Sequence, residues 1–236
     1  MIISNILFLD IETVPQHSTF NEVPDDWKAL WSKKAESLLR SREDETVETI
    51  YGRAGIYAEF GKIICISCGV IQGNNDEKKI VIKSFYGHDE KILLYEFAEM
   101  LRKWAVDQNK CLCAHNGKEF DFPYLCRRMI INNISIPAVL NTSGKKPWEV
   151  NHIDTMELWK FGDFKSYTSL NLLAHTLGIP TPKDDIDGSM VGDVYYKENN
   201  LPRIATYCQK DVVTAAQVFL RINGESLIKA ENIEIK

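Results

Sequence analysis

The sequence predicts one mixed α/β layered domain, in which a β-sheet of about five strands is flanked by helices. Three observations carry this prediction. The chain has 236 residues, which fits one large domain or one domain with an insertion. Apolar, β-rich runs come first, before any long helix that could cover a sheet. Strand-like and helix-like segments then alternate along the chain, as in layered α/β proteins.

The first strand is predicted over residues 2–9, a short apolar and β-branched run. The run stops at Asp10, and Pro15 then breaks the pattern. The sequence therefore predicts a buried strand with an acid at its C-terminal end.

A helical insertion is predicted after this strand, at about 15–60. The segment is polar and of mixed charge, and apolar residues at spacings of three, four and seven predict an amphipathic helix near 25–40. Its tryptophans, Trp27 and Trp31, are expected on the buried face of this helix, and a base-stacking platform is the alternative. The whole chain, 1–236, is expected to form a single domain that includes this insertion.

A β-hairpin is predicted next. Residues 62–72 are apolar and β-rich, residues 73–76 supply a turn, and residues 80–86 alternate between apolar and polar. With the first strand they are expected to form an antiparallel meander. A helix of several turns follows over 89–106, where apolar residues recur at helical spacing.

The remaining elements alternate between strand and helix. They are predicted as a strand at 111–114, a helix at 122–132, a strand at 150–154, and helices at 168–177 and 201–222. Pro202 in the first turn and Gly224 just past the end mark the limits of the last helix. The helix-linked strands are expected to run parallel to the first strand. A polar connector is expected at 181–188, and no element is predicted for 225–236.

Composition excludes a disordered or fibrous chain, since 44% of the residues are hydrophobic and 26% are charged. The net charge of −5 gives no overall basic field, although Lys and Arg supply most non-specific affinity for nucleic-acid phosphates. A nucleic-acid enzyme is still allowed. Clustered catalytic acids lower the net charge, and bound metal ions restore positive potential where the substrate phosphate lies.

The six cysteines are expected to be buried free thiols. Cys65 and Cys68, like Cys111 and Cys113, are closely spaced, but both pairs lie inside strand-like runs and lack the turns that a zinc site needs. Reduced thiols fit a cytoplasmic protein. The start of the chain has no basic region typical of a signal peptide, and no apolar run approaches the length of a membrane span. We therefore expect a cytoplasmic protein with no membrane partner.

Four acids and a tyrosine are the candidate functional residues. Asp10 and Glu12 are two apart, so on an extended segment both side chains point to the same face. Asp121 follows a short strand and opens a helix, and strand ends are where α/β folds place their sites. Tyr207 and Asp211 are four apart and therefore neighbours on one helix face. Acids at the ends of apolar segments are costly to desolvate without cations, which indicates a pair of divalent metal ions.

In this order, the segments resemble the motifs of the DEDD superfamily of 3′–5′ exonucleases, in the subclass whose third motif is Y-x3-D. The three matching segments are Asp10-Ile11-Glu12-Thr13, Asn116-Gly117-Lys118-Glu119-Phe120-Asp121 and Tyr207-Cys208-Gln209-Lys210-Asp211. Residues 169–180 look like the helix that precedes the last motif in many of these enzymes. The chain resembles the predicted exonuclease family related to the proofreading domain of family-B DNA polymerases over nearly its whole length. That resemblance implies a ribonuclease-H-like fold and a single exonuclease domain.

The resemblance also implies the role of each motif residue. Asp10 would bridge two divalent cations, Mg²⁺ or Mn²⁺. Glu12 and Asp211 would complete the site that holds the nucleophilic water, and Asp121 would hold the second ion, partly through water. Tyr207 would orient this water or help to deprotonate it. The product would be a 5′-mononucleotide released from a 3′ end.

Three further residues are expected to contact the substrate. Thr13 and Phe120 would touch the terminal nucleotide, with Phe120 packing on the sugar or base. Asn116 would form a hydrogen bond near the second ion or with the substrate backbone.

Other polar residues near these motifs are not counted among the catalytic residues or metal ligands. His115 invites a role as general base, but in this subclass the tyrosine occupies that position, so His115 and also His152 are expected to be structural. Asp154 lies at a predicted strand end and is interpreted as an acid that supports the ligands without being one of them. Lys145 and Lys146 lie in a loop, where contact with a nucleic-acid backbone and simple solvation are both open.

The favoured function is a metal-dependent 3′–5′ exonuclease that acts on single-stranded or frayed DNA ends. An RNA-trimming exonuclease is an alternative, because selection through the 2′-hydroxyl depends on a few contacts around the terminal sugar. A non-catalytic nuclease-like module that binds nucleic acid or a partner is another alternative, and an endonuclease on the same fold is a third. Proofreading would require a polymerase partner in trans, and an independent repair or turnover role is equally open.

Overall fold

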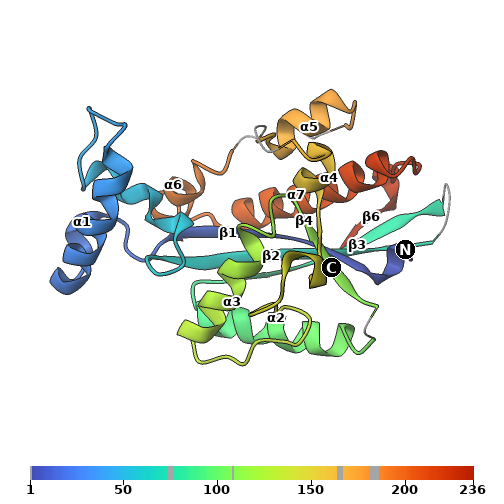
Figure 1. The fold of residues 1–236 in the computed structure, drawn as a ribbon, viewed down its shortest axis with the longest axis horizontal. Coiled ribbons are helices and arrows are strands. Elements are labelled where there is room, and N and C mark those ends of the chain that lie inside the picture. Colours follow the sequence, from blue (N-terminus) through green and yellow to red (C-terminus); the bar gives the residue numbers. More distant parts are fainter. Residues whose placement is uncertain (1, 74–76, 108, 164–166, 181–185) are drawn as a thin grey trace.

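The computed structural model describes residues 2–73, 77–107, 109–163, 167–180 and 186–236. Within them, six strands form one mixed sheet in the order β5-β4-β1-β2-β3-β6 (Figure 1). Their bounds are β1 Ile6–Pro15, β2 Gly61–Gln72, β3 Lys79–Tyr86, β4 Cys111–Ala114, β5 Ile153–Asp154 and β6 Ile233–Ile235. The predicted turn at 73–76 and connector at 181–188 lie partly outside the described residues.

The strand directions confirm the predicted topology. β1 and β3 both pair with β2 in antiparallel fashion, which gives the predicted meander. β4 runs parallel to β1, and β5 runs parallel to β4. β6 was not predicted; it pairs in parallel with β3 and makes the sheet one strand wider than expected.

Helices cover both faces of the sheet. Their bounds are α1 Asp25–Leu39, α2 Glu90–Trp104, α3 Asp121–Ile131, α4 Thr155–Lys160, α5 Leu170–Thr176, α6 Val191–Tyr196 and α7 Leu201–Ile222. In Figure 1, α7 lies above the sheet while α2 and α3 lie below it. Side-chain caps mark the starts of α2 and α7. The Asp89 carboxylate accepts the Ile92 amide at 3.1 Å, and the Asn200 side-chain oxygen accepts the Arg203 amide at 3.2 Å. The predicted helices are confirmed, and the short α4 and α6 were not predicted.

β1 is the central element of the interior. Leu7 and Leu9 pack into the core beneath α2 and α3, while Ile6 and Phe8 pack toward α7, with Phe8 and Phe219 at 5.5 Å between ring centroids. A strand that is buried on both faces sends every side chain into the interior. Polar residues that continue this strand therefore need partners inside the protein.

The segment between β1 and β2 carries a small core of its own. Trp31 on α1 is fully buried, and its indole N–H donates to the Val47 carbonyl at 3.0 Å. Its ring also packs on Phe60 at 5.3 Å. The prediction that the two tryptophans form the buried helix face is right for Trp31, but Trp27 is 39% exposed and touches Phe60 from the rim.

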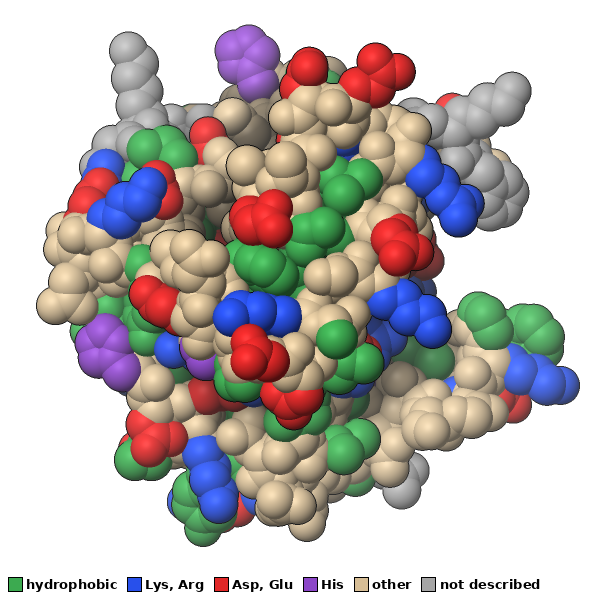
Figure 2. All heavy atoms as spheres, turned by 90° about the vertical axis from the view of Figure 1, so that its left-hand side faces the viewer, with side chains coloured by type: hydrophobic (Ala, Val, Ile, Leu, Met, Phe, Trp, Pro, Cys, Tyr) green, Lys and Arg blue, Asp and Glu red, His purple; other side chains and the backbone are tan. Residues whose placement is uncertain are grey.

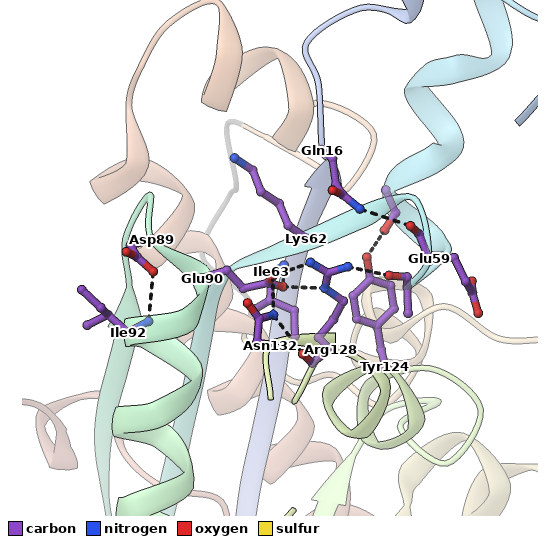
Figure 3. A network of polar contacts seen from close by, with 12 residues as sticks. Gln16, Glu59, Lys62, Ile63, Asp89, Glu90, Ile92, Tyr124, Arg128 and Asn132 are labelled. Carbon is purple, nitrogen blue, oxygen red and sulfur yellow. Dashed lines mark hydrogen bonds and ion pairs between the residues drawn. The ribbon is translucent and has the colours of Figure 1, made fainter. Parts of the chain in front are cut away.

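A buried ion pair joins three elements beneath the sheet (Figure 3). Glu90 on α2 accepts from Arg128 Nε on α3 at 2.8 Å and from the Ile63 amide of β2 at 2.7 Å. Arg128 also donates to the Ala58 carbonyl at 2.8 Å, and Asn132 donates to Glu90 at 2.9 Å. Both charged side chains are at least nine-tenths buried, so their charges depend on these contacts.

All six cysteines are free, as expected; five of them are buried, whereas Cys126 is only partly buried. Figure 2 shows basic and acidic side chains interspersed over the face it displays, in keeping with a net charge of −5. None of the described helices is long and apolar enough to cross a membrane.

Candidate active site

The first acidic motif lies inside β1 and not at its end. The prediction that the strand stops at Asp10 is wrong, because β1 continues to Pro15. Its partner β2 pairs with it from Leu7 to Pro15, with Asp10 opposite Ser67 and Glu12 opposite Cys65. Both acids point toward α7, since their carboxylate oxygens lie within 4.8 Å of one another and of the Cys208 sulfur. Long-range pairing has here overridden local signals that usually end a strand.

Asp121 reaches the same strand from its edge. β4 pairs with β1 only over Ile6–Phe8, so the amides beyond Phe8 on that side have no strand partner from β4. The Asp121 carboxylate accepts the Ile11 amide at 3.2 Å, and its side chain is buried. The second motif therefore enters the sheet where β4 diverges from β1.

The third motif approaches from α7. The Cys208 thiol donates to the Asp10 carbonyl at 3.4 Å, which fixes this part of the helix against β1. Tyr207 is partly buried against the cluster that includes Val14, and its hydroxyl forms a hydrogen bond with Asp211. The geometry thus brings together all five residues that the resemblance singled out.

Burial and the close approach of these acids raise their pKa values. Burial, followed by the charges of Glu12, Asp211 and Asp121, holds the pKa of Asp10 well above its usual range. Burial and Asp211 do the same to the pKa of Glu12. Burial also raises the pKa of Asp121 to about 7, although hydrogen bonds from backbone amides oppose the rise. The protein holds these carboxylates together at an electrostatic cost that bound cations would remove.

We expect the metal-free protein to lose stability as the pH rises from 5 to 8. The Asp121 proton is bound more tightly in the folded state, because its pKa is about 7 there and 3.8 ordinarily. That contribution is fully present below about pH 4 and is lost as the pH passes through about 7. The melting temperature in EDTA should fall by about 3–8 °C over this range. Saturating Mn²⁺ should reduce the fall, and so should Asp121→Asn; equal slopes with and without Mn²⁺ would contradict this.

Asp154 supports the second motif. Its Oδ1 accepts the Asn116 amide at 2.9 Å and its Oδ2 accepts the Lys118 amide at 3.1 Å. Oδ1 also accepts the Met156 amide at 2.9 Å, which caps α4. This is the supporting role expected for Asp154, exerted on the motif's backbone.

The loop of the second motif restricts which residues can occupy two of its positions. Asn116 adopts a positive φ of 62°, a conformation that asparagine tolerates better than most residues. A Cβ on Gly117 would lie 2.4 Å from the Ala114 Cβ, so only glycine fits there. The Asn116 Oδ1 atom is buried without a hydrogen-bond partner, which leaves it available to a ligand.

Both histidines have structural contacts. His115 bonds through Nδ1 to the Thr155 hydroxyl at 2.9 Å and through Nε2 to the Thr168 carbonyl at 2.8 Å. The Leu112 amide donates to Nδ1 of His152 at 3.3 Å, and burial lowers the pKa of His152 to about 4. These contacts support a structural role for both residues.

Thr13 and Phe120 converge on a residue that the sequence did not single out, Tyr124. The rings of Phe120 and Tyr124 lie 5.3 Å apart, and Thr13 forms a hydrogen bond with the Tyr124 hydroxyl. The same hydroxyl donates to the Gly55 carbonyl at 2.7 Å (Figure 3), so the segment before β2 borders this side of the site. The only available signal was the spacing of four residues between Phe120, which directly precedes α3, and Tyr124 on α3.

The fold and the site together define a class of protein. A mixed sheet flanked by helices, with two acids on the central strand facing one acid on a late helix, is a ribonuclease-H-like exonuclease fold. In a comparison with protein families, residues 56–230 match the family described as predicted 3′–5′ exonuclease related to the exonuclease domain of PolB. The chain belongs to this family.

The family match covers only part of the site. It includes Asp121, Tyr207 and Asp211, whereas Asp10 and Glu12 precede residue 56. The structure supplies the missing connection, because β1 places these two acids directly against α7.

Proposed function

We propose that this protein is a two-metal-dependent 3′–5′ exonuclease that releases 5′-mononucleotides from nucleic-acid 3′ ends, with single-stranded or frayed DNA favoured. The observation that carries the proposal is the meeting of acids from β1, α3 and α7, whose burial and mutual charges raise their pKa values. Such a concentration of buried acids is typical of a functional site.

The residues present fit a pair of hard cations, Mg²⁺ or Mn²⁺. Asp10, Glu12, Asp121 and Asp211 would hold them through carboxylate oxygens, the ligands that such ions prefer. The Asp10 Oδ2 atom is buried and has no hydrogen-bond partner, as expected of an oxygen that faces an ion. When bound, two such ions activate a water and stabilise the attacking and leaving oxygens of an in-line displacement.

Tyr207 would orient the attacking water. Burial first, and then the charges of Asp211, Glu12 and Asp10, hold the pKa of the phenol well above its usual range. A phenol that keeps its proton is a poor base. Because its O–H is directed to Asp211, the oxygen lone pairs remain free to accept a hydrogen bond from water. This favours orientation over deprotonation as the role of Tyr207.

The 3′ end of the nucleic-acid substrate would lie against Thr13 and Phe120. These two side chains are partly buried, which leaves surface on which a terminal sugar and base can rest. Asn116, whose Oδ1 atom has no hydrogen-bond partner in the protein, would donate or accept hydrogen bonds next to them. The contacts on Tyr124 hold this surface in place.

The proposal is tested with 5′- and 3′-labelled DNA and RNA oligonucleotides in Mg²⁺, Mn²⁺ or EDTA. The expected result is a ladder of products shortened from the 3′ end, which disappears in EDTA and in Asp211→Ala. Faster cleavage of RNA would reassign the substrate to RNA. Binding without cleavage would establish the non-catalytic alternative, and activity in EDTA would overturn the metal dependence.

Tyr207→Phe is expected to lower the exonuclease rate by about 10–100-fold, because the water loses its orienting oxygen. Affinity for Mn²⁺, measured by calorimetry, should change little, since the phenol is not among the proposed ligands. Tyr95→Phe is the matched control, because Tyr95 is an exposed residue of α2 on the opposite side of the sheet. An unchanged rate in Tyr207→Phe would reassign this tyrosine to a structural role.

A further inference from the structure

Cys208 lies inside the proposed active site, although the exonuclease mechanism gives it no task. It is fully buried on α7, between Tyr207 and Asp211 in the motif. Its sulfur lies within 4.8 Å of carboxylate oxygens of both Asp10 and Glu12. The thiol also donates to the Asp10 carbonyl at 3.4 Å, so the sulfur is held beside the acids and does not turn away from them.

Oxygens of the two carboxylates and the sulfur form one compact group, all within 4.8 Å of one another. Glu12 is only 8% exposed, and the Asp10 Oδ2 atom is buried without a hydrogen-bond partner. An unsatisfied buried oxygen next to a buried acid indicates a cationic ligand. The sulfur borders this position from α7, the helix that also carries Asp211.

Sulfur changes which cations such a position prefers. Mg²⁺ and Mn²⁺ take oxygen ligands and gain little from a thiol, whereas Zn²⁺ and Cd²⁺ bind thiolates strongly. Ligand atoms around one tetrahedral zinc ion lie roughly 3.5 Å apart. The cluster spans at most 4.8 Å, so a contraction of about 1 Å would bring all three atoms onto one ion.

We propose that Cys208, Asp10 and Glu12 form a binding site for one thiophilic divalent cation of the zinc class. On binding, the thiol proton passes to solvent and the sulfur exchanges its hydrogen bond to the Asp10 carbonyl for a bond to the ion. The ion draws both carboxylates toward α7 and competes with the hard cations that they would otherwise hold. The competition rests on the proposed exonuclease function, while the binding itself does not.

The binding is tested with Cd²⁺, whose bond to a thiolate gives an ultraviolet charge-transfer band that needs no enzyme activity. The proteins are wild type, Cys208→Ser and, as the matched control, Cys126→Ser. Cys126 also donates its thiol to a backbone carbonyl at 3.4 Å, that of Leu140, but it is not part of the acid cluster. The wild type and the control should bind Cd²⁺ with equal affinity, and Cys208→Ser should bind at least about tenfold more weakly.

A second variant keeps the thiol and removes an acid. Glu12→Gln should also weaken Cd²⁺ binding by about tenfold, which separates coordination from a folding defect in Cys208→Ser. Circular dichroism of each variant checks the fold. A charge-transfer band of equal strength and affinity in wild type and Cys208→Ser would overturn the proposal.

Inhibition is measured separately, as the Zn²⁺ concentration that halves the Mg²⁺-supported exonuclease rate of each protein relative to its own rate without zinc. Cys208→Ser should need at least about tenfold more Zn²⁺ than wild type. If none of the proteins cleaves nucleic acid but the Cd²⁺ band still depends on Cys208, the exonuclease proposal fails and the thiol site stands. If cleavage occurs and the band does not depend on Cys208, the exonuclease proposal stands and the thiol site fails.

Discussion

Replacing Asp10 by asparagine is expected to abolish exonuclease activity and, at the same time, to stabilise the metal-free protein. Activity should fall by at least about 10³-fold, because an amide cannot supply the negative charge that holds the cations, and the cations would stabilise the negative charge that develops on the phosphate. Stability should rise by about 1–3 kcal/mol at pH 8, because the substitution removes a charge next to three others and replaces a carboxylate oxygen by an NH₂ group that can donate to the neighbouring carboxylates. A loss of activity together with a gain in stability is what distinguishes this prediction from that of a simple folding defect.

The measurements are the cleavage rate in Mn²⁺ and urea unfolding in EDTA. Asp25→Asn is the control, because Asp25 is fully exposed and pairs only with Lys28 at 3.1 Å among the ion pairs of the described residues. It should alter neither quantity beyond experimental error. Retained activity in Asp10→Asn would refute the metal site, and a loss of stability in EDTA would show that the carboxylate is satisfied in the folded protein.

Replacing Arg128 by methionine is expected to destabilise the protein by about 3–5 kcal/mol, the effect of leaving one partner of a buried ion pair without the other. Glu90 would keep its contacts with Ile63 and Asn132 but lose its only buried cation among the described residues. The Ala58 carbonyl would also lose its donor, so the segment before β2 would be less firmly held. Urea unfolding measures the loss directly.

Two comparisons isolate the buried pair. Lys79→Met removes a pair with Glu234 in which both side chains are more than two-fifths exposed, and it should change stability by less than about 1 kcal/mol. The double variant Glu90→Gln with Arg128→Met should recover part of the loss, because no charge is left buried alone. A single Arg128→Met variant within about 1 kcal/mol of wild type would show that water reaches Glu90.

The sequence predicted the elements that local pattern determines. The helix at 201–222 matches α7 at both ends, because Pro202 and Gly224 mark its limits in the sequence itself. The hairpin of β2 and β3 was equally visible as two apolar runs around a turn. The motif spacings were enough to indicate that Asp10, Glu12, Asp121, Tyr207 and Asp211 share one site.

What the sequence could not predict depends on contacts between distant segments. β1 extends through two acids and a proline because β2 pairs with it along its length. β6 has three residues and forms because β3 offers it an edge, at Ile80–Ile82. Cys208 was predicted as an ordinary buried thiol, and only the packing of α7 on β1 shows that its sulfur lies beside the acids.

The hydrogen bond from the Ile11 amide to Asp121 couples a main-chain proton in the middle of the sheet to the charge of the site. The chemical shift of this one amide therefore depends on whether the carboxylate is protonated, ionised or shared with a cation. The protein thus contains its own spectroscopic probe, the Ile11 backbone amide, at a buried position in the sheet. An NMR titration that follows Ile11 can observe the centre of the site from within the backbone.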